Sequence, residues 1–163
     1  GYPHPDHVMC HTVSLAAWEA TADAEKYPET GEPWQPLKMY YNMGMSRTRM
    51  TAIDEQMKLA GREPVYQEWL ANMGDRPDSI NRVTTRVPCG NYFEQRDDAL
   101  RAHATQIDPQ GRWFAAPLDI QRAAWPTEDF ELAKAAFEVP VPEDDLFAGV
   151  REHLAVAPVA ARS

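Results

Sequence analysis

The sequence has few cysteines, no long hydrophobic run and a shortage of basic residues, and each absence excludes a class of protein. Two cysteines, Cys10 and Cys89, in 163 residues are too few for a disulfide-rich scaffold, so we expect reduced thiols in a cytoplasmic protein. No stretch approaches the ~18 consecutive apolar residues of a transmembrane helix. The net charge of −9, from 25 acidic and 16 basic residues, has the wrong sign for binding nucleic acid or an anionic membrane. These absences favour a protein that acts on small molecules.

Several common catalytic signatures are absent as well. The sequence contains no G-x-G-x-x-G loop, no Walker loop and no G-x-S-x-G elbow. What it does contain is an ordinary globular composition, with 44% apolar and 25% charged residues. Together with the length, this predicts one domain over residues 1–154 and a frayed tail over residues 155–163.

Hydrophobic spacing, caps and breakers predict the secondary structure. A helix should begin at Asp6 as its N-cap, and a second should begin after Ser46 and end before Gly61. We expect helices over residues 6–26, 46–60, 64–74, 91–106, 117–125 and 144–154, and strands over residues 37–43 and 82–89. Because strands alternate with helices, the pattern favours an α/β fold.

The residues with the most chemistry lie in residues 2–7 (YPHPDH). His4 and His7 are three residues apart, with the carboxylate of Asp6 between them. Neutral imidazole is a common zinc ligand, and a neighbouring carboxylate can orient or charge the other ring. If His4 ends a loop and His7 starts a helix, one ring can bind a metal while the other faces a substrate. A His-x-x-His pair alone is a weak signal, and Asp6 could be only a helix cap.

One histidine does not make a metal site, because a catalytic zinc takes about three protein ligands. His7 and His11 have the spacing of a zincin pair but lack its glutamate, so a core or indirect supporting role is expected for His11. The other candidate ligands have no convincing spacing, and Cys89 belongs to no C-x-x-C pair. We expect Cys10 and His103 to be buried. Asp97 and Asp98 should face solvent. The shortage indicates that the remaining ligands lie upstream of Gly1.

Residues 2–8 (YPHPDHV) resemble the second conserved motif of the LmbE/PIG-L family of zinc-dependent amidases and deacetylases. Four further segments, residues 82–87 (RVTTRV), 99–106 (ALRAHATQ), 125–129 (WPTED) and 142–149 (PEDDLFAG), are similar to its mycothiol branch. The family's first motif, A-H-P-D-D-E, supplies two zinc ligands and a general base and occurs nowhere in this sequence. The resemblance therefore covers only the C-terminal part of a family protein.

The resemblance implies a fold and a role for each site residue. The fold would be the C-terminal part of a Rossmann-like domain with a mostly parallel sheet whose N-terminal strands are missing from this chain. His7 would be the third ligand of one zinc ion, with ferrous iron as the alternative metal. His4 would stabilise the oxyanion and protonate the leaving amine, Asp6 would hold His4 in its charged state, and Tyr2 would polarise the scissile carbonyl.

The implied function is hydrolysis of a carbon–nitrogen bond other than a peptide bond. The substrate would be a small-molecule mycothiol S-conjugate, cleaved to a mercapturic acid and glucosaminyl-inositol in a cytoplasmic detoxification step. The expected partner is the N-terminal half of the same enzyme, with neither nucleic acid nor membrane involved. Two alternatives stay open: zinc-dependent deacetylation of N-acetylglucosaminyl-inositol, and a non-catalytic fragment that binds a sugar or a partner protein.

Overall fold

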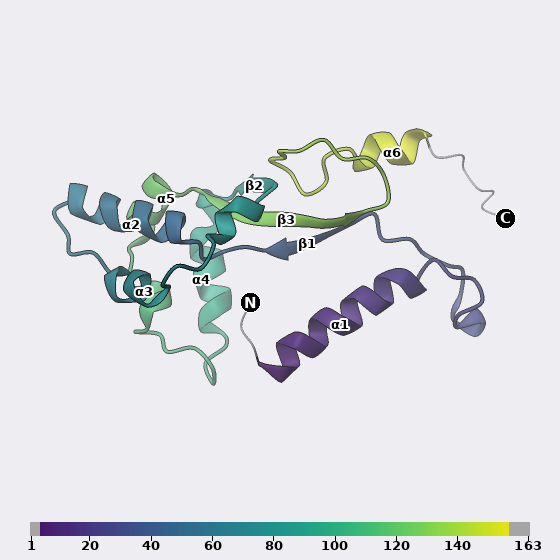
Figure 1. Cartoon of the computed structure of the whole chain (residues 1–163), viewed down its shortest axis with the longest axis horizontal. Helices are drawn as coiled ribbons and strands as arrows, with labels where there is room; N and C mark the ends of the chain where they lie inside the picture. The colour runs from purple at the N-terminus through teal and green to yellow at the C-terminus, as the bar shows by residue number, and fades with distance from the viewer. Residues whose placement is uncertain (1–3, 157–163) are drawn as a thin grey trace.

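The computed structural model describes residues 4–156, so Tyr2 lies outside the described residues. Helices and three strands alternate irregularly along this part of the chain (Figure 1). The α-helices are α1 (Pro5–Ala20), α2 (Arg47–Leu59), α3 (Gln67–Asn72), α4 (Phe93–Arg101), α5 (Leu118–Ala124) and α6 (Val150–Val156), and short 3₁₀ turns include η2 (Ser79–Arg82) and η4 (Arg112–Phe114). The strands are β1 (Lys38–Asn42), β2 (Thr85–Pro88) and β3 (Thr127–Ala135). None of the helices in residues 4–156 is long and apolar enough to cross a membrane.

The three strands form one sheet in the order β1-β3-β2, and both strand pairs are antiparallel. Tyr41 lies opposite Glu131, and Thr85 lies opposite Phe130. The prediction of helices mixed with strands is confirmed, but the mostly parallel sheet is wrong for the described residues, and a Rossmann-like fold is not established. The central strand β3 escaped the sequence analysis because its sequence, TEDFELAKA, is rich in residues that favour helices. Hydrogen bonding to β1 on one edge and to β2 on the other overrides the helical preference of these residues.

The best-predicted element is α2, because its ends carry clear local signals. The hydroxyl Oγ of Ser46 accepts a hydrogen bond from the Arg49 amide at 3.0 Å, and Gly61, just past the end, has a φ of +68°. By contrast, Asp6 is not the N-cap of α1; His4 is, and this helix ends at Ala20 rather than near residue 26.

The last predicted helix is mostly wrong. Residues 144–149 are not α-helical, and α6 covers only Val150–Val156, two residues into the predicted tail; residues 157–163 lie outside the description.

The core lies where α2 packs against α5 and the segments around Tyr66 and Ala116. Met50, Ile53 and Met57 are spaced along one face of α2 and are at most 5% exposed. Burying each such side chain contributes about 1.5–3 kcal/mol. This core holds α2, α3 and α5 together at the helical end of the molecule (Figure 1).

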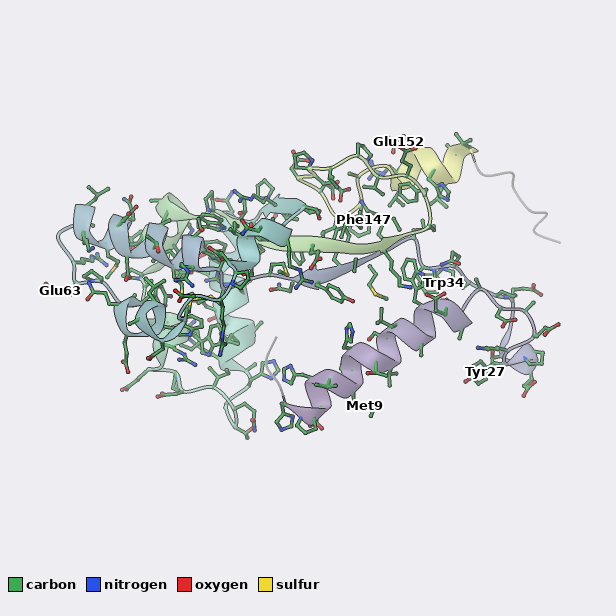
Figure 2. The ribbon with its side chains drawn as sticks, viewed as in Figure 1. Met9, Tyr27, Trp34, Glu63, Phe147 and Glu152 are labelled. Carbon is green, nitrogen blue, oxygen red and sulfur yellow. The ribbon has the colours of Figure 1, made fainter. Side chains whose placement is uncertain are left out.

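Helix α1 lies apart from this core, along the side of β1 (Figure 1). None of the residues of α1 is buried, and Val8, Met9 and Val13 are each more than half exposed (Met9 is labelled in Figure 2). Its contacts with the sheet include the ring of His11 against Tyr41, with centroids 5.6 Å apart, and an ion pair between Glu19 and Lys134. Helix α1, which carries His7 and has His4 as its N-cap, therefore contacts the sheet through side chains such as these, and it has no buried face.

Candidate functional site

A large cavity lies between α1, β1 and the helical end of the molecule. Its volume is about 1410 Å³, above the usual range of about 300–1,000 Å³ for small-molecule pockets. Its walls combine imidazole, thioether, aromatic and guanidinium groups, among them His7, His11, His103, Met39, Met43, Tyr41, Trp113, Arg49, Arg82 and Arg96. A cavity of this size and mixed polarity suits a ligand larger than one sugar ring.

Of the predicted site residues, the structure describes His4, Asp6 and His7, which stand at the N-terminal end of α1. His7 lines the cavity, whereas His4 is the helix N-cap and is about half exposed. The two rings are 6.1 Å apart between centroids and nearly perpendicular, at 74°. The two imidazoles are therefore in edge-to-face contact at the start of α1.

His4 and Asp6 are close, but their contact differs from that in the sequence-based scheme. The His4 Nδ1 accepts a hydrogen bond from the Asp6 backbone amide at 3.2 Å, and it lies 3.7 Å from the Asp6 carboxylate. The lone pair of Nδ1 is therefore used by the helix cap, and this nitrogen does not donate to the Asp6 carboxylate.

The described residues do not form a complete metal site. No group of three or more histidine, cysteine, aspartate or glutamate side chains within residues 4–156 is placed to hold a metal ion. His7, His11 and His103 line the same cavity without forming such a group. His7 alone does not satisfy the donor set that a zinc ion needs, so this part of the chain does not fit zinc by itself.

Three predictions about the other candidate residues are wrong, and one is confirmed. Cys10 and His103 are exposed rather than buried, because the face of α1 and the end of α4 border the cavity instead of a packed core. His11 is exposed too, so it is not a core residue, and its supporting role stays a prediction. Asp97 is 3% exposed rather than solvated, whereas Asp98 does face solvent.

Asp97 belongs to a buried polar network that the sequence analysis missed. Arg49 donates to both carboxylate oxygens of Glu128, at 3.1 and 3.2 Å, and to the carbonyl oxygen of Gly44. Arg96 donates to Glu128 at 3.0 Å and to Asp97 at 2.8 Å. These residues come from α2, α4 and β3 and meet in the wall of the cavity. The one available signal was Arg49, which falls on the face of α2 that also carries the core residues.

The charges of this network hold one another in place. Burial alone would raise the pKa of Glu128, but hydrogen bonds and charge from Arg49, and then from Arg96, lower it below its usual value. The same carboxylates raise the pKa of Arg96 against the effect of its own burial. The wall therefore keeps fixed charges of both signs next to the cavity.

A second buried carboxylate, Glu143, fastens the segment after β3 onto the sheet. Its side chain is 1% exposed and accepts hydrogen bonds from Tyr40 at 2.8 Å and Thr85 at 3.0 Å, and it is paired with Lys38. Burial and the hydrogen-bonded Glu143 raise the pKa of Tyr40 well above its usual value. The resemblance over residues 142–149 thus falls on a segment with a structural anchor.

Comparison with known proteins gives the class of protein to which this chain is similar. The chain resembles curated amidases and deacetylases over most of its length, which confirms the resemblance to the LmbE/PIG-L family. It is 50% identical over 155 residues to the mycothiol S-conjugate amidase of Streptomyces coelicolor, covering 94% of this chain and 53% of that protein.

Deacetylases match at lower identity. A 1D-myo-inositol 2-acetamido-2-deoxy-alpha-D-glucopyranoside deacetylase of Frankia alni is 35% identical over 156 residues, covering 91% of this chain and 53% of that protein. A deacetylase of the same name from Rhodococcus jostii is 34% identical over 157 residues, covering 92% of this chain and 51% of that protein. The chain spans about half the length of the curated relatives it matches. No family model and no solved structure matches it.

Proposed function

We propose that this chain is part of an enzyme that hydrolyses the amide bond of mycothiol S-conjugates and releases a mercapturic acid and glucosaminyl-inositol. The observation that carries the proposal is the 50% identity, over 94% of the chain, to a mycothiol S-conjugate amidase. The cavity supports it, since a conjugate of acetylcysteine, glucosamine and inositol needs more room than a single sugar. The apolar part of the wall, with Met39, Met43 and Trp113, suits the variable group on sulfur.

In this proposal His4 and His7 have separate tasks. His4, the N-cap of α1, stabilises the developing oxyanion and gives a proton to the leaving amine, with Asp6 as its partner. Tyr2 completes the polarisation of the carbonyl. The 3.7 Å between the His4 ring nitrogen and the Asp6 carboxylate supports the pairing of these two groups.

We further propose that the activity is zinc-dependent, with His7 as the ligand from this chain. Since residues 4–156 hold no three-ligand group, the other ligands would come from an N-terminal half packed against the α1 side of the cavity. A bound zinc ion would supply an activated water and a Lewis acid.

The test compares two substrates on a polypeptide in which this chain is joined to the proposed upstream half. Hydrolysis of a mycothiol–bimane conjugate in preference to N-acetylglucosaminyl-inositol supports the amidase. The reverse preference supports the deacetylase, the second candidate, which the 34–35% identities to curated deacetylases favour. Absence of both activities from a polypeptide that includes the upstream half would leave a non-catalytic role and overturn the proposal.

Substitutions of the two histidines test their roles. We expect His4→Ala to lower turnover by about 10²–10³-fold while bound zinc is retained, because the proton donor is lost and the ligand is not. His7→Ala should lower bound zinc, measured by elemental analysis. His153→Ala is the control, since this ring stacks on Phe137 and does not line the cavity. Full turnover in His4→Ala, or normal zinc in His7→Ala, would contradict the assignment.

A further inference from the structure

Three of the seven methionines of the chain, Met39, Met43 and Met45, fall within seven residues, and all three line the cavity. Met39 lies in β1, and the other two lie in the connection from β1 to α2. The whole stretch from Met39 to Met45 (MYYNMGM) borders the cavity and contains no charged residue. Each of the three methionines is only partly buried, so part of its surface remains accessible.

The backbone that carries these methionines is fixed by contacts with β3 and α2. The Met43 amide donates to the carbonyl oxygen of Asp129 in β3 at 2.9 Å. The carbonyl oxygen of Gly44 accepts from the guanidinium of Arg49 in α2 at 3.0 Å. Met45 also packs against the hydrophobic core. The wall therefore has an ordered backbone, and its freedom to adapt lies in the side chains.

Methionine suits a wall that accepts apolar groups of different shapes. Its side chain is unbranched, has three rotatable bonds and ends in a polarizable thioether, so it can follow the outline of a ligand. Surfaces rich in methionine are typical of sites with many apolar partners. Two aromatic rings extend this wall: Tyr41, whose ring lies 5.6 Å from that of His11, and Trp113, which is 41% exposed.

The methionine wall is a poor place for a charged or strongly hydrated group. A thioether sulfur is only a weak hydrogen-bond acceptor, so it does not replace the water that such a group loses. The nearby guanidinium groups of Arg49 and Arg96 are already paired with Glu128 and Asp97. An apolar or aromatic group gains most from this part of the cavity.

We propose that Met39, Met43 and Met45 bind the variable group on the sulfur of the substrate and determine which conjugates are accepted. This inference rests on the proposed function. In such a conjugate, the glucosamine and inositol rings carry many hydroxyl groups, whereas the group on sulfur is the part that is large and apolar. The thioether wall accordingly selects conjugates whose sulfur carries an extended apolar or aromatic group.

The experiment uses a polypeptide in which this chain is joined to the proposed upstream half, with two substrates: the mycothiol–bimane conjugate and the S-methyl conjugate of mycothiol. Met39→Gln and Met43→Gln keep the length of the side chain and replace its thioether by a polar amide. We expect each to lower kcat/KM for the bimane conjugate about threefold to tenfold, mainly through KM, and to change that for the S-methyl conjugate less than about twofold. The matched control is Met9→Gln, which alters an exposed methionine of α1 outside the cavity and should affect neither substrate.

A second variant separates loss of apolar contact from loss of folding. Met43→Leu keeps an apolar side chain and should retain most of the activity on the bimane conjugate. Equal losses on both substrates, no loss on either, a loss in Met43→Leu as large as in Met43→Gln, or an effect of Met9→Gln as large as that of Met43→Gln would overturn the inference. If the unmodified enzyme cleaves neither conjugate, the proposed function itself has failed, and that result is distinct from failure of the methionine wall.

Discussion

Replacing Glu128 by glutamine removes the one carboxylate that two arginines of the cavity wall share. The side chain of Arg49 is 5% exposed, and three of its hydrogen bonds are to Glu128 and Gly44. Glutamine keeps the size of glutamate but carries no charge, and its amide nitrogen cannot accept from a guanidinium. The variant E128Q therefore leaves the Arg49 charge buried without its counterion.

Removing one member of a buried ion pair costs about 3–5 kcal/mol. Glu128 is 22% exposed and Arg96 keeps Asp97, so the lower end of that range applies, about 3 kcal/mol. For a chain of this length each kcal/mol shifts Tm by roughly 2–4 °C, so E128Q should melt about 6–12 °C lower. A loss of this size is a large part of a typical stability of about 5–15 kcal/mol.

The same residue predicts a dependence of stability on pH. The folded pKa of Glu128 lies below its usual value, so its contribution is present above the unfolded pKa of about 4.3 and is lost as the pH falls through the folded pKa. Urea denaturation followed by circular dichroism between pH 7 and pH 3 measures this change. E128Q should reduce the stability at pH 7 and flatten its decline below pH 5.

The control is E94Q, which removes an exposed carboxylate paired with Arg122 outside the cavity and should change the midpoint little. An E128Q midpoint within 2 °C of the unmodified chain, with the same loss of stability in acid, would refute the counterion argument.

Two further substitutions test the core and a helix cap. Met50 is fully buried on α2, so Met50→Ala should cost about 2–5 kcal/mol in urea denaturation; a cost below 1 kcal/mol would mean that α2 does not form the core. Ser46→Ala removes the acceptor for the Arg49 amide and should cost about 1 kcal/mol, measured by the same assay, whereas Ser46→Asp should restore most of it.

Local signals explain which elements could be predicted. The helix from Arg47 to Leu59 has a serine cap at its start, a glycine with positive φ beyond its end and apolar residues at helical spacing. β1 likewise has three consecutive large residues, Met39, Tyr40 and Tyr41, at its centre. Both elements are encoded in short stretches of sequence, and the structure confirms both. β3 is not, because its strand conformation depends on two neighbours that come from distant parts of the chain.

In the candidate site, too, some residues carry a local sequence signal, whereas others are revealed only by their tertiary contacts. The spacing of the histidines at positions 4 and 7 made them candidates, and their site roles stay predictions. Their resemblance to a family motif pointed to a hydrolase of the LmbE/PIG-L type. The partners of the buried charges could not be identified. Asp97 looks like a solvent-facing helical residue until Arg96 and Arg101 are placed beside it.

By itself, the sequence determined the residue types at the start of α1, the well-capped helices and the similarity to mycothiol-related enzymes. Only the tertiary structure decided that the sheet is antiparallel and that three arginines, each paired with a carboxylate, line one cavity. The physical reason is the separation along the chain over which each interaction acts. Caps, turns and apolar periodicity act over a few residues, whereas the pairing of charges such as Arg49 and Glu128, 79 residues apart, exists only after the chain has folded.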